Sequence, residues 1–309
     1  MNYSVVFICD DKYVMPTVVA MTSLAKNVKE NDECLIYVIC DSVSDDNKDR
    51  LRFIQKKNVR IKIIDVDSKQ FKGLEKSYLK VSKAALLKFE IPNLVKEDKA
   101  LYLDGDVLVV SDISEIFNTD IGNVYAGVVK DGPKTKVAGG KKHYYYGEEN
   151  YFNSGVMLLN LRRMREHNIP KKLLDFRLTE YNYFMDQDAF NRVLGKEVVY
   201  MSLFYDFMLH LVSYINELYT TEQISEFYGV GDFSTTDELF ENVKIYHYTF
   251  DKPWKYYDIP MNEIWMNYYK QSSYKDIKLI RNSSMTRLFN SKTYKVGEKI
   301  SRIYRLLKK

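Results

Sequence analysis

The strongest constraint on the fold is a regular alternation of strand-like and helix-like segments at the start of the chain. Short runs rich in β-branched and aromatic residues occupy residues 3–9, 35–40 and 59–65, and helix-like stretches near 14–28 and 44–57 separate them. This β-α-β-α-β order predicts an α/β fold whose mostly parallel central sheet is covered by helices on both faces. Ligands of such sheets bind at the carboxyl ends of the strands, and the first of these ends carries Asp10 and Asp11.

The same patterns continue further along the chain. We expect a helix around 82–94, a strand that runs into the acidic end of residues 99–106, and strands at 124–129 and 155–160. Helices are expected at 170–181 and 186–194, the second with Asp186 as its N-cap. Residues 131–151 contain Gly, Lys and three consecutive tyrosines, and they are expected to form a long loop that lines a site.

Charge is divided unevenly between the body of the chain and its end. Residues 1–269 hold 34 Lys and Arg against 40 Asp and Glu, whereas residues 270–309 hold 12 against 2. A body with this acidic balance repels phosphate backbones, so we expect no nucleic-acid partner. No apolar run is long enough to cross a membrane, and Asp10 interrupts the N-terminal run Val5–Cys9. The protein is therefore expected to be soluble or peripherally attached to a membrane.

The chain has three cysteines, and none of them forms a C-x-x-C pair. Cys9, Cys34 and Cys40 all lie in apolar, strand-like runs. This placement indicates buried thiols rather than a disulfide or a zinc site, and it favours a cytoplasmic location.

Two carboxylates follow the strand-like run Leu101–Leu103. Asp104 and Asp106 are two residues apart on an extended chain, so both project to the same side and can share one cation. Carboxylate oxygens suit Mg²⁺ or Mn²⁺, which commonly complete their shell with substrate phosphates. Gly105 would let the ligand approach the backbone. The alternative is a solvated turn that happens to contain two acids.

A histidine and a lysine late in the chain extend this candidate site. His247 follows an apolar strand, and an imidazole added to two carboxylates shifts the preference toward Mn²⁺. Lys252 could supply a point charge to a diphosphate. The alternative for His247 is a buried side chain hydrogen-bonded to the backbone. Asp186, Gln187 and Asp188 form a weaker signal, because clusters of this kind at a helix start are mostly caps.

Taken together, five segments resemble one enzyme family. Residues 7–13 (FICDDKY), 101–107 (LYLDGDV), 152–160 (FNSGVMLLN), 186–188 (DQD) and 247–254 (HYTFDKPW) resemble, in order and separation, the retaining glycosyltransferases of family 8, which have the GT-A fold. The similarity covers about residues 3–257 and extends to bacterial galactosyl- and glucosyltransferases of lipopolysaccharide and capsule synthesis. The chain departs from the family pattern at Lys88, where Arg is usual, and at Phe250, in a shortened loop.

The resemblance implies a role for each matching residue. It implies that Asp104, Asp106 and His247 bind Mn²⁺, with Mg²⁺ as a second choice, and that the metal contacts the diphosphate of UDP-glucose or UDP-galactose. Lys252 would neutralise the phosphates, and the nucleoside would contact Ile8, Asp10 and Lys12. The sugar, its anomeric carbon and the donor phosphates would be contacted by the remaining residues of the implied site, Lys88, Gly105, Asp131, Asn153, Asp186, Gln187 and Asp188, of which the last three would be catalytic.

The implied activity is transfer of a hexose to a glycan or lipid-linked saccharide with retention of configuration. Gln187 would lie nearest the back of the anomeric carbon, and an amide is a poor nucleophile, which favours front-face attack over a covalent intermediate. One alternative is a haloacid-dehalogenase-like phosphatase, although its D-x-D motif normally follows the first strand. Another is a non-catalytic nucleotide-sugar-binding protein on the same scaffold.

We expect a transferase domain over residues 1–260 and a basic, aromatic tail over 261–309. Within the tail, Val296, Ile300, Ile303 and Leu307 recur at helical spacing, and Lys and Arg residues lie between them. Such an amphipathic helix over residues 294–309 is suited to an anionic membrane surface, which would place the enzyme on the cytoplasmic face of the cell membrane. The alternative is docking onto the catalytic domain or a partner subunit. We expect that Tyr144, Tyr145 and Tyr146 either form a platform for the acceptor or pack as a hydrophobic plug that holds their loop against the protein.

Overall fold

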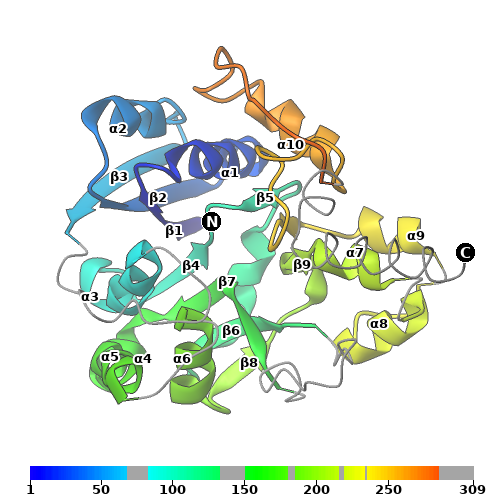
Figure 1. Cartoon of the computed structure of the whole chain (residues 1–309). Helices are drawn as coiled ribbons and strands as arrows, with labels where there is room; N and C mark the ends of the chain where they lie inside the picture. Colours follow the sequence, from blue (N-terminus) through cyan, green and yellow to red (C-terminus); the bar gives the residue numbers. More distant parts are fainter. Residues whose placement is uncertain (68–82, 133–149, 180–184, 216–218, 234, 285–309) are drawn as a thin grey trace, which may run out of the picture.

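The computed structural model describes residues 1–67, 83–132, 150–179, 185–215, 219–233 and 235–284 (Figure 1). Within these residues the main sheet consists of β1 (Asn2–Asp10), β2 (Glu33–Asp41), β3 (Val59–Val66), β4 (Lys99–Leu103), β6 (Ala126–Lys130), β7 (Phe152–Asn160) and β8 (Val198–Tyr200). Their order is β3-β2-β1-β4-β7-β6-β8. Only β7 runs against the other strands of this sheet. The predicted α/β class with a mostly parallel sheet is confirmed.

The β-α-β-α-β order predicted for the start of the chain is also confirmed. α1 (Val14–Asn27) connects β1 to β2, and α2 (Asp45–Arg52) connects β2 to β3. Alternate side chains of β1 enter different cores: Val5, Phe7 and Cys9 pack on the α1 side of the sheet, and Val6 and Ile8 pack on the opposite side. Both faces of the sheet are therefore buried. All three cysteines are free, buried thiols, as predicted.

The second face of the sheet is covered by the segment before β4 and by helices after β7. A single helix is predicted over 82–94, but the structure has a 3-10 helix, η2 (Lys83–Glu90), followed by the short α3 (Ile91–Leu94). Pro92 explains the difference, because in a continuous α-helix its ring would clash with the carbonyl of residue 88. α4 (Leu161–Glu166) and α5 (Ile169–Thr179) pack beside these elements.

α6 (Met185–Leu194) begins one residue earlier than predicted. Asp186 therefore lies inside the first turn of α6 and is not its N-cap. Its carboxylate is bound by Lys88 and the Ser154 hydroxyl rather than by the helix backbone.

A second, small sheet is not predicted by the sequence patterns. It joins β5 (Val107–Val109), β10 (Ile245–His247) and β9 (Phe207–Met208) in that order. β5 directly follows Asp106, and its antiparallel pairing with β10 places His247 opposite Val107. The small sheet thereby brings the late histidine to the acidic end of β4. The other described helices are η3 (Ser114–Asn118), η4 (Leu203–Tyr205), α7 (His210–Tyr214), α8 (Thr221–Tyr228) and α9 (Thr236–Glu241).

The last described helix, α10 (Asn262–Tyr269), lies beside α1 (Figure 1). The Asn27 amide donates to the Tyr268 hydroxyl at 3.1 Å, and the Arg50 guanidinium donates to the Ser273 carbonyl at 2.6 Å. Trp265 is buried in the core. The division at residue 260 stays a prediction, and the predicted helix over 294–309 lies outside the described residues. Among the described helices, none is long and apolar enough to cross a bilayer.

Candidate active site

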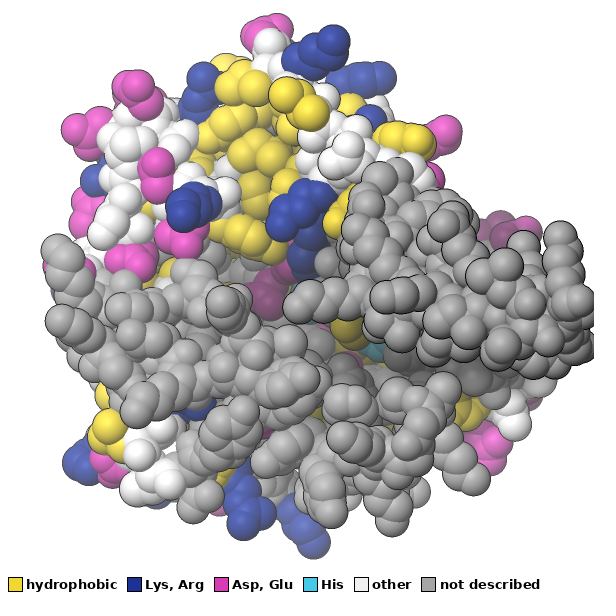
Figure 2. Space-filling model, in the orientation of Figure 1, with side chains coloured by type: hydrophobic (Ala, Val, Ile, Leu, Met, Phe, Trp, Pro, Cys, Tyr) yellow, Lys and Arg dark blue, Asp and Glu magenta, His cyan; other side chains and the backbone are white. Residues whose placement is uncertain are grey.

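A cavity of about 570 Å³ opens at the carboxyl ends of β1 and β4. In the space-filling view, acidic side chains in magenta and a histidine in cyan are visible deep in the centre of the molecule (Figure 2). The cavity brings together twelve of the predicted site residues from distant parts of the chain. They are Ile8, Asp10, Lys88, Asp104, Gly105, Asp106, Asp131, Asn153, Asp186, Gln187, His247 and Lys252.

Two predicted site residues do not line this cavity. Lys12 is exposed, on the turn between β1 and α1. Asp188 is buried behind the cavity wall, where it accepts a hydrogen bond from the Tyr151 hydroxyl at 2.6 Å. On α6 it follows Gln187 by one residue, so its side chain leaves the helix in another direction.

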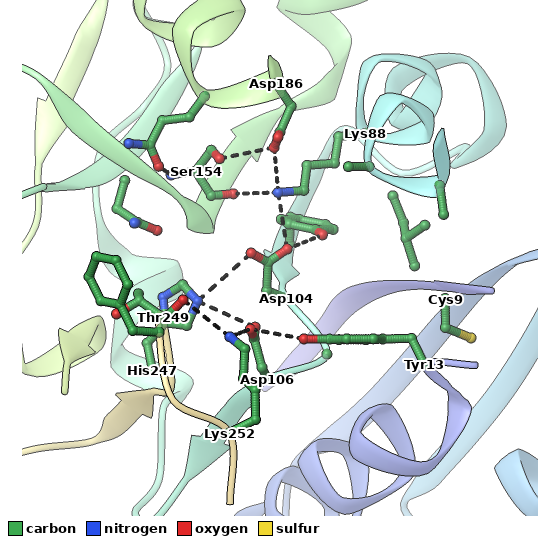
Figure 3. A pocket seen from close by; sticks show the side chains of 18 of the residues that line it. Cys9, Tyr13, Lys88, Asp104, Asp106, Ser154, Asp186, His247, Thr249 and Lys252 are labelled. Atoms are coloured by element: carbon green, nitrogen blue, oxygen red, sulfur yellow. Dashed lines mark hydrogen bonds and ion pairs between the residues drawn. The ribbon is translucent and has the colours of Figure 1, made fainter. Parts of the chain in front are cut away.

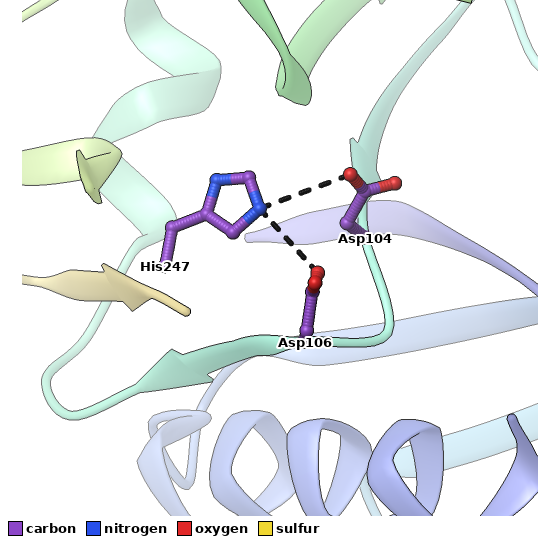
Figure 4. Close-up of side chains that lie close together, drawn as sticks. All are labelled: Asp104, Asp106 and His247. Atoms are coloured by element: carbon purple, nitrogen blue, oxygen red, sulfur yellow. Dashed lines mark ion pairs between the residues drawn. The ribbon is translucent and has the colours of Figure 1, made fainter. Parts of the chain in front are cut away.

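Asp104, Asp106 and His247 form the candidate metal centre (Figure 4). His247 Nε2 lies 3.4 Å from Asp106 Oδ1 and 3.8 Å from Asp104 Oδ2. One ligand atom from each of the three residues lies within 4.8 Å of the others, so a single ion can reach all three. This is the arrangement expected for a Mg²⁺ or Mn²⁺ site with room for further oxygen ligands.

Two glycines shape this centre in different ways. A Cβ on Gly155 would lie 2.2 Å from the His247 ring and 2.9 Å from Asp104 Oδ2, so only glycine leaves space for the three ligands. Gly105 lines the cavity, but a Cβ there would lie 2.4 Å from Thr17 Oγ1 on α1. The absence of a side chain at Gly105 thus serves the packing of α1 against the D-G-D turn, in addition to any approach of a ligand.

Asp106 and His247 belong to one charged network (Figure 3). Lys252 Nζ lies 2.6 Å from Asp106 Oδ2, which also accepts from the Tyr13 hydroxyl at 3.1 Å. Burial opposes the charge of Asp106, but Lys252 and His247 hold the pKa of its carboxyl well below the usual range. Burial likewise opposes a charged imidazole, yet Asp206 and Asp106 raise the pKa of His247 to about 10. His247 is therefore buried, as the alternative interpretation holds, but its partners are carboxylates rather than the backbone.

Lys88 joins the metal centre to the wall formed by α6. Its side chain is buried, and Nζ lies 3.0 Å from Asp104 Oδ1 and 2.6 Å from Asp186 Oδ2. Nζ also donates to the Ser154 carbonyl at 3.3 Å. Burial disfavours the charged amine, but the two carboxylates raise the pKa of Lys88 above its ordinary value. The lysine is thus a fixed cation shared by Asp104 and Asp186.

Gln187 is held by hydrogen bonds on both sides of its amide. Its Nε2 donates to Asp131 Oδ2 at 2.8 Å, and its Oε1 accepts from the Ser154 backbone N–H at 3.2 Å. Burial raises the pKa of Asp131 to about 6. These contacts fix the orientation of the amide at the cavity surface.

Several residues of the site could not be singled out in the sequence. Tyr13 and Ser154 lie within the quoted motifs, but no spacing rule marks their contacts with Asp106 and Asp186. His210 and Thr249 line the cavity and hydrogen-bond to each other at 2.9 Å. Asp206 is fully buried, with Oδ1 2.8 Å from His247 Nδ1. For His210 the scarcity of histidine is a usable signal, since the chain has only four.

Comparison with known proteins decides the family. Residues 4–258 match the model of glycosyl transferase family 8. The chain belongs to glycosyltransferase family 8. It is 30% identical over 200 residues to general stress protein A of Bacillus subtilis, covering 62% of this chain and 68% of that protein. It is 28% identical over 304 residues to the glycosyltransferase GlyB of Streptococcus pneumoniae, covering 94% of this chain and 67% of GlyB.

Solved structures agree with the family in their fold. The galactosyltransferase LgtC, in complex with donor and acceptor sugar analogues, superposes with a TM-score of 0.70 at 24% identity, covering 87% of this chain and 96% of LgtC. The predicted resemblance to family 8 and the GT-A fold are confirmed, and the chain is a glycosyltransferase of a retaining family. Nothing in the comparisons supports a phosphatase.

Proposed function

We propose that this family 8 enzyme transfers glucose or galactose from a UDP-sugar to a glycan or lipid-linked saccharide, with retention and with the help of Mn²⁺. The observation that carries the proposal is the partly buried cluster of Asp104, Asp106 and His247, which faces the same cavity as Lys88 and Gln187. A charged centre beside a wall of hydrogen-bonding groups suits a ligand in which a diphosphate is joined to a sugar.

The donor set fits a divalent metal. Two carboxylate oxygens and an imidazole nitrogen converge, and the imidazole turns its other nitrogen to a buried carboxylate, as metal-bound histidines commonly do. Mn²⁺ accepts this mixed oxygen and nitrogen set more readily than Mg²⁺, which remains a second choice. When bound, the ion would stabilise negative charge on the departing diphosphate.

The chain's own residues would bind the rest of the donor. Asp10, at the end of β1, lies where the nucleoside of a Rossmann-like fold binds, and Lys252 is close enough to the metal centre to meet a phosphate. Lys88, Asp131 and Asn153 line the cavity toward Gln187 and are proposed to contact the sugar. Lys12 and Asp188 do not line this cavity, so their proposed contacts with the donor would have to lie outside it.

Front-face attack is the mechanism that these contacts favour. A covalent intermediate requires an available nucleophile near the anomeric carbon. The Asp186 carboxylate is paired with Lys88 at 2.6 Å and with the Ser154 hydroxyl at 3.0 Å, which lowers its nucleophilicity, and the Gln187 amide is intrinsically weak. We therefore propose that the acceptor hydroxyl attacks from the side of the leaving diphosphate.

A role in cell-surface polysaccharide synthesis is supported by one further relative. The lipopolysaccharide 1,2-glucosyltransferase of Escherichia coli is 26% identical over 288 residues, which cover 88% of this chain and 80% of that enzyme. Binding of an anionic membrane through residues 294–309, on the cytoplasmic face, would bring the enzyme to a lipid-linked acceptor. The proposed acceptor contacts of Tyr144–Tyr146 lie outside the described residues.

The test is a panel of UDP-sugars with Mn²⁺, in which slow donor hydrolysis is measured without acceptor, together with p-nitrophenyl phosphate. Hydrolysis of UDP-glucose or UDP-galactose but not of the phosphate ester is expected. Asp106→Ala should abolish it, whereas Asp112→Asn, at a carboxylate that pairs with Lys29 outside the cavity, should not. If Asp106→Ala hydrolysed the donor as fast as the wild type, the proposed metal site would be wrong.

A further inference from the structure

We propose that Asp206 is a positioning residue that holds the His247 ring with Nε2 aimed at the gap between Asp104 and Asp106. The inference rests on the proposed metal site and adds a residue outside the cavity wall. Asp206 does not line the cavity, so it would act only through His247.

Asp206 is fully buried beside the His247 imidazole. Its side chain is 0% exposed, and Oδ1 lies 2.8 Å from His247 Nδ1. Oδ2 is also buried and has no hydrogen-bond partner in the described part of the chain. A buried carboxylate oxygen without a partner costs stability, so a residue retained only for packing would be better served by an apolar side chain. Within the described part of the chain, the hydrogen-bond partner of the Asp206 carboxylate is the His247 imidazole.

That contact fixes which nitrogen faces the metal centre. When Nδ1 donates its proton to Asp206, the lone pair of a neutral imidazole resides on Nε2. Nε2 is the atom that lies 3.4 Å from Asp106 Oδ1 and 3.8 Å from Asp104 Oδ2. The ring also lies close to Gly155, where a Cβ would come within 2.2 Å of Cε1. Asp206 and Gly155 thus both restrict the orientation of the ring.

The backbone holds Asp206 at the required place. Asp206 immediately precedes β9, which pairs in parallel with β10 through Tyr246↔Phe207 and His247↔Met208. The Leu209 N–H donates to the His247 carbonyl at 2.9 Å and extends this pairing. The imidazole therefore comes from β10 and the carboxylate from the residue just before β9, and the pairing of these two strands sets their separation.

Binding of Mn²⁺ to the full chain without donor, followed by the electron paramagnetic resonance signal of the free ion, tests the proposal. Asp206→Asn keeps the size of the side chain but can turn an N–H toward Nδ1, which would favour the tautomer that blocks Nε2. We expect Mn²⁺ binding to weaken roughly 10- to 100-fold in Asp206→Asn and in Asp206→Ala. Tyr125→Phe, which removes the hydroxyl 2.8 Å from His167 Nδ1 away from the cavity, is the matched control and should leave the affinity unchanged.

A double-mutant cycle separates positioning from a general structural effect. In a His247→Ala background, Asp206→Asn should cause no further loss of Mn²⁺ affinity, because the residue through which it acts is gone. Wild-type affinity in Asp206→Asn, or an equal loss with and without His247, would overturn the proposal. Circular dichroism checks that each variant is folded. If Asp206→Ala does not fold, the test is made with Asp206→Asn. If wild-type protein and Asp106→Ala bound Mn²⁺ equally, the proposed metal site would be wrong, and with it the proposed function rather than the role of Asp206 alone.

Discussion

Lys88 is the residue that joins the candidate metal centre to the cavity wall formed by α6. Its buried amine is shared by Asp104 and Asp186, so Lys88→Ala would leave the buried carboxylate of Asp186 and the partly buried one of Asp104 without their cation. We expect this change to lower the free energy of unfolding of the metal-free protein by about 3–5 kcal/mol in a urea titration. Lys88→Arg, the usual family residue, should retain most of the stability. Equal stability of Lys88→Ala and the wild type would mean that the ion pairs do not form.

Because of Asp131, part of the free energy of unfolding should be lost as the pH rises. Its folded-state pKa of about 6 lies above the ordinary value of 3.8, so the folded protein binds this proton more tightly than the unfolded chain. The contribution is full below the ordinary pKa and is lost as the pH rises through 6. Asp131→Asn should therefore gain up to about 3 kcal/mol over the wild type near about pH 8, and the gain should shrink as the pH falls.

Thermal unfolding across this pH range measures the effect of Asp131, and Asp112→Asn serves as the comparison with opposite sign. Although partial burial opposes it, Lys29 and Ser114 lower the pKa of Asp112, so its contribution is present at neutral pH and is lost in acid. A gain for Asp131→Asn that did not change with pH would contradict the assignment of the raised pKa to this carboxyl.

The three residues of the candidate metal centre could be predicted from sequence because each lies in a recognisable local pattern. Asp104 and Asp106 end a strand, and His247 sits in a motif that the family shares. Asp206 and the contact of Gly155 with the imidazole could not be predicted. Both depend on how closely β9, β10 and β7 approach one another in space, and no residue spacing along the chain encodes that distance.

Helix α10 packs behind the candidate site. The ring centroid of Trp265 on α10 lies 5.8 Å from that of Trp254, and the Trp265 ring stacks on Tyr269 with a centroid distance of 5.4 Å. Trp254 in turn meets the ring of Tyr13 edge-on at 5.7 Å, and Tyr13 donates to Asp106. These aromatic side chains connect α10 to the candidate metal centre.

Trp265→Ala should destabilise the protein by about 3–5 kcal/mol, the usual cost of removing a buried aromatic side chain. Differential scanning calorimetry measures the loss, and Trp265→Phe should recover much of it. Tyr257→Ala, at an exposed aromatic residue, is the control and should change little. A small effect of Trp265→Ala would show that α10 is not required for the folded domain.

The elements themselves were predictable to the extent that they are long. The strands and helices of the first 66 residues follow clear periodic patterns and are confirmed, although α2 ends at Arg52 rather than near residue 57. β5 has three residues and β9 has two, too few to show a period, so the small sheet could not be predicted. The reversed direction of β7 was equally hidden, because an apolar strand buried on both faces reads the same in either direction.

For the whole molecule, the contacts after α10 decide where the tail can be removed. The Arg281 guanidinium donates to Asn262 Oδ1 at 2.7 Å, and Arg50 and Ser273 are joined by two hydrogen bonds. A chain ending at Ser284 should keep the stability and donor hydrolysis of the full protein, whereas one ending at Tyr269 should melt at a lower temperature. Melting curves of the two truncations, compared with the full chain, check this.

The same truncations test the proposed membrane contact. Full-length protein should co-sediment with phosphatidylglycerol vesicles at low salt and be released at high salt, because the attraction is electrostatic. The chain ending at Ser284 should not bind at either salt concentration. Binding that persists in this truncation would place the contact elsewhere, and no binding by the full chain would favour docking of the tail on protein.

Trp254 and Trp265 are the only tryptophans in the sequence, and they lie side by side behind the candidate metal centre. Lys252 precedes Trp254 by two residues, and Tyr13 links that indole to Asp106. All of the tryptophan fluorescence of this enzyme therefore originates from one spot beside its site. A ligand that draws Lys252 or Tyr13 toward a phosphate should change the emission of the native, unlabelled protein. If the donor binds as proposed, Trp254 and Trp265 give this chain an intrinsic optical probe of its binding.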